Sequence, residues 1–318
     1  AVEGGRYYSA IAYLIDWLGI FPEEYDSYDE LGKISSLYIT PDNLHITNAV
    51  VIPARKNAQD NDLIKNALIN YGAVAVSHNA DFDEEKYFNP VYSAQYYNGK
   101  GSANHLVCIV GWDDNYSRGN FNPFNRPEGD GAWIVKNSWG TDWGDGGYFY
   151  LSYYDTSFAD KECVCYIIHN DQYTRIYQHD VGGDSKWIPE SKYYASIFTA
   201  DDDELIGAVG TVFNKSGREY EFTITVNDVD VYTQKGISKI SGYETIKLDK
   251  VVPIKKGEVF KITFENTACV VHDLRIHPQK GKSFVSDDKK EWEDLSKVYF
   301  IAVLKAYAVP RLDTTIAS

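Results

Sequence analysis

The sequence contains no methionine, although a chain of 318 residues with average composition would contain several. It also has no uninterrupted run of eighteen or more apolar residues, which a membrane-spanning helix would need. The first five residues, Ala1 to Gly5, lack the basic and hydrophobic regions of a signal sequence. We therefore expect a processed or trimmed product that is soluble and has no transmembrane segment.

Basic residues are in the minority. The chain has 31 Lys and Arg against 46 Asp and Glu, which gives a formal net charge of -15. This charge repels nucleic-acid phosphates and anionic lipid headgroups, so nucleic acid and membrane surfaces are not expected as partners. The length, together with a hydrophobic content of 44%, predicts two domains.

Only four cysteines are present, and they lack the repeated Cys-x-x-Cys spacing of a zinc site. They are Cys108, Cys163, Cys165 and Cys269. On a strand, Cys163 and Cys165 would point to the same side. A disulfide from one of these two to Cys269 and free buried thiols are both compatible with the sequence.

Two segments have the apolar spacing of helices. The first runs from Tyr7 to Leu18, and Gly19 predicts its end. The second follows Asp60 or Asn61 as its cap, stops at Gly72, and has an inner face of Ile64, Ala67, Leu68 and Tyr71.

Strand-like stretches follow the second helix. They comprise residues 73–77, 105–112, 132–137 and 147–153, of which the last three are predicted to form one antiparallel unit around the loop 113–131. From about residue 171, short alternating strands separated by Lys-Gly, Ser-Gly and Asn-Asp turns predict a β-sandwich. In it, residues 220–226 should bury Tyr220, Phe222, Ile224 and Val226 on one face.

Two polar residues are predicted at the ends of neighbouring strands, 32 positions apart. His105 begins one strand and Asn137 ends the next. A lone His at a strand edge is usually structural, and a lone Asn usually makes a turn. Together, an imidazole and a carboxamide on one sheet could form an oriented hydrogen-bonded pair, as in a nucleophile, base and orienter triad.

The surrounding residues make this pattern specific. His105 leads an apolar strand that ends in Gly111-Trp112, and Lys136-Asn137-Ser138-Trp139-Gly140 is followed by Trp143-Gly144 and Gly147-Tyr148. This pattern resembles the papain-like cysteine peptidases over roughly residues 1 to 168. The resemblance implies that His105 is the base, that Asn137 holds its imidazole, and that Trp139 covers their hydrogen bond. It also implies that Gly4, Gly5 and Asn104 lie along the substrate cleft, while Gly4-Gly5 is equally compatible with a plain turn.

The sequence departs from this family at the nucleophile. The family's Cys-Gly-x-Cys-Trp-like segment and its preceding Gln are absent, and none of the four cysteines is followed by Trp. Cys108 lies three residues after His105 on one strand, so we expect its side chain to point away from His105 and into the core. We expect the nucleophile segment to lie upstream of residue 1.

The second domain resembles the lectin-like domain that follows the peptidase in some bacterial and archaeal surface cysteine peptidases. The segments that carry this resemblance are 195–200, 204–209, 241–244, 256–258 and 282–286. It implies a jelly-roll-like sandwich, an exported, surface-associated setting and cell-wall glycan as a candidate partner. The acidic run Asp201, Asp202, Asp203 is either a solvated loop or a source of carboxylates for a structural calcium ion.

We therefore predict an α+β fold. A papain-like peptidase domain without its N-terminal part spans 1–170, a jelly-roll-like antiparallel β-sandwich spans 171–308, and 309–318 form a tail. The predicted function is a cysteine endopeptidase that hydrolyses exported or cell-envelope proteins and requires no cofactor. The alternative is a catalytically inactive surface protein with a glycan-binding sandwich and a peptidase-like scaffold. A Ser, Ala or Gly at the upstream nucleophile position would favour the alternative.

Overall fold

The structure, a computed structural model, describes residues 7–18, 20, 44–83, 85–168, 173–183, 185–187, 191–265, 269–271 and 276–311. The chain divides into two compact units. Unit 2 comprises residues 50–167, and unit 1 comprises residues 1–49 and 168–318. Gly4, Gly5 and Gly19 lie outside the described residues.

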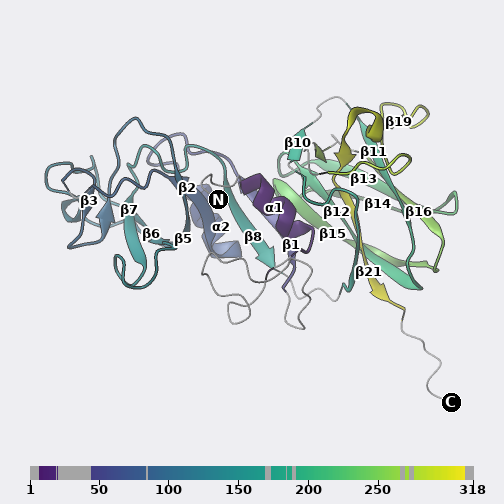
Figure 1. Ribbon diagram of the computed structural model, residues 1–318, viewed down its shortest axis with the longest axis horizontal. Helices are drawn as coiled ribbons and strands as arrows, with labels where there is room; N and C mark the ends of the chain where they lie inside the picture. The colour runs from purple at the N-terminus through teal and green to yellow at the C-terminus, as the bar shows by residue number, and fades with distance from the viewer. Residues whose placement is uncertain are drawn as a thin grey trace, which may run out of the picture. The chain divides into compact units, whose positions relative to one another are not determined.

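Unit 2 is built on one sheet with the strand order β3-β4-β7-β6-β5-β2-β8 (Figure 1). Its described strand pairs are antiparallel except for β4 and β7, which are parallel. The bounds are Val74–His78 for β2, Phe88–Asn89 for β3, Ala94–Gln95 for β4, His105–Asp113 for β5, Ala132–Lys136 for β6, Tyr148–Ser152 for β7 and Cys163–Ile168 for β8. The predicted strands of this region are therefore confirmed to within about one residue at each end.

Alternating side chains of the central strands form the core of unit 2. The buried members include Val74, Val76, Val107, Ile109, Trp133, Val135, Phe149 and Leu151. Helix α2 (Asp62–Tyr71) buries Ile64 and Ala67, as predicted. Tyr71 is 41% exposed, so its predicted place on the inner face is wrong. Asn61 occupies the N-cap position, but its side chain makes no capping hydrogen bond.

Helix α1 (Tyr7–Ile15) belongs to unit 1 and is shorter than predicted. It ends at Ile15 because Trp17 adopts a left-handed backbone conformation with φ of 60°. The amide of Leu18 then donates to the carbonyl of Tyr13, which satisfies one of the last helical carbonyls. Asp16, at this turn, is 2% exposed.

The larger part of unit 1 is a sandwich of antiparallel sheets (Figure 1). One layer has the order β15-β12-β21-β9 and the other β14-β13-β16-β11-β18-β19. The bounds are Arg175–Tyr177 for β9, Tyr193–Thr199 for β11, Glu204–Phe213 for β12, Glu219–Val226 for β13, Val229–Ile237 for β14, Gly242–Ile254 for β15, Val259–Glu265 for β16, Ser283–Ser286 for β18, Glu293–Asp294 for β19 and Leu304–Pro310 for β21.

Shorter elements complete the described parts of the chain. A three-stranded sheet has the order β10-β17-β20. Its strands are Ser185–Trp187, Cys269–Val271 and Ile301–Ala302. Strand β1 (Ile46–Ile52) leads from unit 1 into unit 2, and 3-10 turns occur at Arg118–Asn120 (η1) and Leu295–Val298 (η2).

One apolar core fills the sandwich, with side chains from both layers. Phe222 and Ile224 of β13 are almost fully buried in it, and Tyr220 and Val226 pack against it partly buried. The predicted inward face of residues 220–226 is therefore confirmed. Alternation with period two places these four side chains on the same side of the strand.

A buried ionic cluster joins α1 to the sandwich inside unit 1. The Lys305 Nζ of β21 donates to Asp16 Oδ1 at 2.6 Å, Gln178 Oε1 at 2.7 Å and Asp180 Oδ1 at 2.8 Å. The Lys305 side chain has no exposed area. Burial opposes its charge, but the carboxylates of Asp180 and Asp16 prevail and raise the pKa of Lys305. The end of α1 is thereby fixed to β21.

Candidate active site

The first residue of β5 and the residue after β6 form a hydrogen-bonded pair in unit 2. Nε2 of His105 lies 2.9 Å from Oδ1 of Asn137. Asn137 is 7% exposed, whereas His105 is only partly buried. The backbone amide of Asn137 donates to the carbonyl of Gly147 at 2.9 Å, which holds the residue in place. The predicted pairing of the two side chains is present.

A second hydrogen bond determines which ring nitrogen of His105 carries the proton. The backbone N–H of Ser138 donates to Oδ1 of Asn137 at 2.8 Å, which identifies this atom as the amide oxygen. An amide oxygen only accepts, so Nε2 of His105 must donate. In a neutral imidazole Nδ1 is then the free base, and it can take a proton from a thiol.

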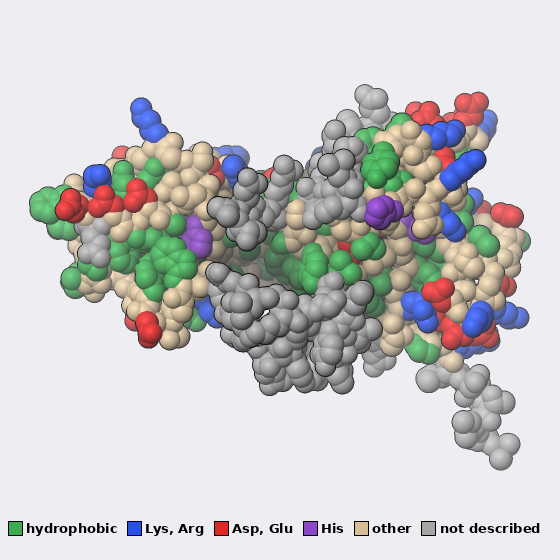
Figure 2. All heavy atoms as spheres, viewed as in Figure 1, with side chains coloured by type: hydrophobic (Ala, Val, Ile, Leu, Met, Phe, Trp, Pro, Cys, Tyr) green, Lys and Arg blue, Asp and Glu red, His purple; other side chains and the backbone are tan. Residues whose placement is uncertain are grey.

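An aromatic cluster lies beside this pair. The Trp139 ring is 5.2 Å from the His105 ring and is 46% exposed. Trp139 in turn contacts Trp143 at 5.0 Å and Phe82 at 5.2 Å. Figure 2 shows a histidine beside a group of hydrophobic side chains on this face of unit 2. Trp139 is placed where it could shield the hydrogen bond, and that role stays a prediction.

Glycines allow the chain to turn tightly after Trp139. Gly144 has a φ of +62°, and a Cβ there would lie 2.5 Å from the carbonyl oxygen of Tyr148. Gly147 has a φ of +92°, and a Cβ there would lie 3.1 Å from the carbonyl oxygen of Gly140. Only glycine fits both positions without strain. The two glycines therefore allow the loop to place the Gly147 carbonyl where it accepts the hydrogen bond from the Asn137 amide.

A second histidine lies behind the pair and was missed by the sequence reasoning. His78, on β2, is the cross-strand partner of His105, and the two rings are 5.7 Å apart. It has no exposed area, and neither ring nitrogen makes a hydrogen bond of regular geometry, although the Asn79 backbone and the Gln95 side chain lie near enough to act on its pKa. Burial and then the charge of His105 lower the pKa of His78 to about 3, so this imidazole is neutral. Its alternation with Val74 and Val76 was the available signal.

The described cysteines are unsuited to nucleophilic attack. Cys108, Cys163 and Cys165 are free thiols, so neither Cys163 nor Cys165 forms the disulfide that the sequence allowed. The side chain of Cys269 is not among those that the structure describes. Burial raises the pKa of Cys163 to about 12 and that of Cys165 to about 11. A thiol with so high a pKa has almost no thiolate at neutral pH.

Cys108 lies on the face of β5 opposite His105, as expected, but it does not point into the core. Val107 and Ile109 are the buried neighbours, and Cys108 is partly exposed between Leu106 and Val110, which are 46% and 42% exposed. Burial still raises the pKa of Cys108. The predicted inward orientation is wrong because the core lies on the other side of this strand.

The remaining predicted residues have structural contacts. Asn104 is exposed, and its Oδ1 accepts a hydrogen bond from the Ala80 amide at 2.8 Å, so it links the end of β2 to the start of β5. Its role in the substrate cleft stays a prediction. Asp201 pairs with Arg175, while Asp202 and Asp203 accept backbone hydrogen bonds. No cluster of three or more His, Cys, Asp or Glu suited to a metal occurs among the described residues.

Comparison with known families gives this geometry its context. Residues 1–170, more than half of the chain, match the family model of the papain family cysteine proteases. The chain belongs to the papain family. Residues 176–308 match the model of a lectin-like domain. The papain-family segment thus includes α1 and all of unit 2, and the lectin-like segment includes both layers of the sandwich.

Two curated relatives each match about half of this chain. Mouse pro-cathepsin H is 29% identical over 169 residues, which cover 52% of this chain and 45% of the relative. A probable cysteine protease of Arabidopsis thaliana, RD19D, is 33% identical over 153 residues, which cover 46% of this chain and 37% of the relative. The chain therefore spans less than half the length of these two relatives.

Two solved structures match nearly the whole chain and share its fold. The clostridial cysteine protease Cwp84 after propeptide cleavage matches with a TM-score of 0.80 and 24% identity, over 97% of this chain and 83% of that one. The cysteine protease and lectin-like domains of Cwp84, a surface layer associated protein of Clostridium difficile, match with a TM-score of 0.79. At this identity the match shows a shared fold: papain-like and then sandwich. Among the described helices, none has the length and apolar character to cross a membrane.

Proposed function

We propose that the protein is a cysteine endopeptidase in which His105 is the catalytic base and Asn137 its orienting partner. The observation that carries the proposal is the 2.9 Å contact of His105 Nε2 with an Asn137 oxygen that the Ser138 N–H identifies. This arrangement leaves Nδ1 to act on a thiol. The nucleophilic cysteine would lie on a segment upstream of residue 1, because Cys163 and Cys165 are buried thiols of high pKa and Cys108 lies on the face of β5 opposite His105.

The proposed chemistry assigns each proton. Nδ1 of His105 takes the proton of the cysteine thiol, and the thiolate attacks the peptide carbonyl carbon. The resulting imidazolium then gives its proton to the leaving amine as the C–N bond breaks, which leaves a thioester. Water, deprotonated by the same nitrogen, hydrolyses the thioester and restores the thiol. Asn137 keeps the ring orientation through both halves without competing for the proton.

Exported or cell-envelope proteins are the proposed substrates, and an exported or cell-surface location is the proposed setting. Support comes from the shared fold with Cwp84, which is described as surface layer associated, and from the lectin-like match. Cell-wall glycan is a proposed ligand of the sandwich. A structural calcium ion at Asp201, Asp202 and Asp203 is also proposed, although Asp201 would first have to leave Arg175. A calcium-dependent rise in Tm that EDTA reverses would support the ion.

The test compares the full-length protein with its His105→Ala variant. Wild type should cleave an unfolded protein such as β-casein and should react covalently with a thiol-directed epoxide, and the variant should lose cleavage. His105→Ala should not unfold unit 2, because His105 is only partly buried at the start of β5. Full activity of the variant would refute the assignment. Inertness of wild type to substrate and reagent would favour the inactive, glycan-binding alternative.

A further inference from the structure

We propose that a hollow on unit 2, lined by Phe88, Pro90, Asn122 and Phe124, is an accessory substrate-binding site of the peptidase. It would take an apolar or aromatic side chain of the polypeptide substrate several residues from the scissile bond. The inference rests on the proposed function. The hollow has a cavity volume of about 460 Å³, within the usual range of about 300–1,000 Å³ for ligand sites.

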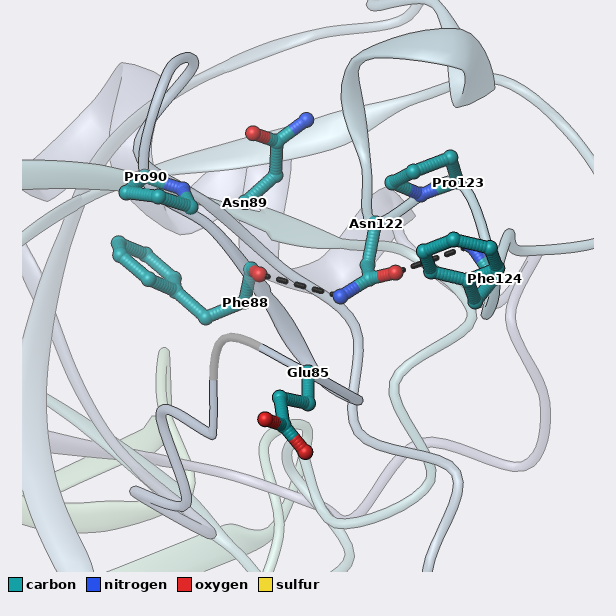
Figure 3. Close-up of a pocket in the computed structure, with 7 residues that line it drawn as sticks. All are labelled: Glu85, Phe88, Asn89, Pro90, Asn122, Pro123 and Phe124. Carbon is teal, nitrogen blue, oxygen red and sulfur yellow. Dashed lines mark hydrogen bonds between the residues drawn. The ribbon is translucent and has the colours of Figure 1, made fainter.

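The loop that forms one wall of the hollow is fixed in position. Phe121, directly before this wall, has no exposed area and packs in a core cluster with Ala94, Tyr96, Tyr116 and Ala132. Asn122 is 2% exposed, and its amide accepts from the Phe124 N–H at 2.9 Å and donates to the Phe88 carbonyl at 3.3 Å. In Figure 3, these two bonds link the Phe88 side of the hollow to the Phe124 side. The hollow is therefore preformed.

Large apolar side chains are exposed at the hollow and directly after the lining residue Pro90 in the sequence. Phe124 is 91% exposed, Val91 is 82% exposed and Tyr92 is 50% exposed. Single exposed apolar residues are common, but Phe124 lines a hollow, and Val91 and Tyr92 follow its lining residue Pro90 in the sequence, which is more typical of a binding surface. Because Asn122 fixes the backbone at Phe124, the loop can present the ring at little cost in ordering.

Aromatic rings connect the hollow to the catalytic pair within the same unit. The ring centroids are 5.2 Å apart from His105 to Trp139, 5.0 Å from Trp139 to Trp143, and 6.0 Å from Trp143 to Phe88. An extended peptide advances about 3.3 Å per residue, so about five residues are enough to span this path. A polypeptide substrate that is bound at His105 and extends about five residues beyond it can thus reach the hollow.

The lining residues indicate the chemistry of the occupant. Phe88, Pro90, Pro123 and Phe124 supply apolar surface, which suits a Leu, Phe or Tyr side chain. Among the described residues, Glu85 is the only charged one that lines the hollow, and its carboxylate has no ion-pair partner there. A basic side chain next to the apolar one would complement it. An extended substrate segment therefore fits better than a second copy of this chain, whose net charge is -15.

The experiment uses the full-length protein and two substrates of different reach. One is β-casein, an unfolded protein, and the other is a fluorogenic dipeptide amide, which is too short to reach the hollow. Phe124→Ser should raise KM for β-casein about ten- to hundredfold, as expected for losing the burial of one large apolar side chain, and should leave the dipeptide kinetics unchanged. Glu85→Gln should reduce cleavage near Lys and Arg, measured by mass-spectrometric mapping of the products.

Ile69→Ser is the matched control, because Ile69 is 69% exposed on α2 of the same unit. The inference is overturned if Phe124→Ser changes the kinetics of both substrates equally or of neither. It is also overturned if the only effect of Phe124→Ser is a loss of self-association, measured by sedimentation. If wild type cleaves neither substrate, binding of β-casein measured by calorimetry separates the two proposals. Binding that Phe124→Ser removes would retain the site and refute the peptidase, and absence of binding would refute both.

Discussion

Replacing His78 by Leu should remove most of the acid sensitivity of unit 2. His78 has an ordinary pKa of 6.5, which burial, and then the charge of His105, lower to about 3 in the folded protein. Between these values the unfolded chain binds a proton on this imidazole and the folded chain does not. His78 therefore does not lower the free energy of unfolding above pH 6.5. Below that pH its contribution reduces the free energy of unfolding progressively until the pH reaches about 3. At pH 4.5, two units below 6.5, the loss is about 2.7 kcal/mol at 1.36 kcal/mol per unit.

The assay is urea unfolding at pH 7.5 and pH 4.5, read by hydrogen exchange of the β2 and β5 amides. Between pH 7.5 and pH 4.5, the free energy of unfolding of the wild type should fall by about 2.7 kcal/mol more than that of His78→Leu. At pH 7.5 the free energies of unfolding of the two proteins should agree within about 1.5 kcal/mol, because the lost imidazole makes no hydrogen bond of regular geometry and Leu fills a similar volume. The amides of β12, in unit 1, serve as an internal control.

Asp155 also titrates in unit 2, with the opposite sign. Burial raises its pKa to about 6, so its contribution favours the folded state at low pH and diminishes as the pH rises through 6. This effect is common to wild type and variant and cancels in the comparison. Equal acid sensitivity of both proteins would show that His78 is protonated or hydrated in the folded state, and the reasoning would fail.

Five more outcomes are expected. In the full-length protein, His105→Ala should abolish peptidase activity, and Asn137→Ala should reduce kcat about ten- to thousandfold because it disturbs orientation only. Lys305→Met should destabilise unit 1 by about 3–5 kcal/mol in urea unfolding, because it leaves two buried carboxylates without their cation; a loss under 1 kcal/mol would contradict the cluster. Gly144→Ala should cost about 1–3 kcal/mol by the same measurement through strain at a φ of +62°. Cys163 should resist alkylation at pH 8 while the protein is folded, since its pKa is about 12, and rapid labelling would show that the strand opens.

The sheet of unit 2 and the pairing of His105 with Asn137 can be predicted from the sequence, because each depends on local patterns. Strand alternation and the glycine-rich loop after Trp139 are readable one segment at a time. For His78 the alternation with Val74 and Val76 is the one signal, and it does not by itself distinguish a buried imidazole from one exposed at the end of the strand. The same holds for Cys108, whose outward orientation depends on which face of β5 the rest of unit 2 covers.

The helix ends show a second limit. Gly72 marks the end of α2, but α1 ends at Ile15 through Trp17, a residue type that rarely adopts positive φ. The reason is tertiary: Trp17 stacks on His45 at 4.1 Å and contacts Tyr307 at 5.3 Å. Lys305 could not be predicted as a buried residue either, because its two carboxylates come from positions 16 and 180 of the sequence.

The cluster around Lys305 has a consequence for dissecting the protein. The family match ends at residue 170, yet Asp16 inside that match has its cation on β21. A peptidase fragment cut at residue 170 would keep the aspartate and lose the lysine, together with Gln178, whose side-chain amide donates to the Asp16 carbonyl at 3.0 Å. The sandwich fragment would keep a lysine that has lost one of its carboxylates. The boundary between the two family matches is therefore not a point at which the folded chain can be cut without loss. An isolated peptidase fragment should need a replacement for Lys305 and for Gln178.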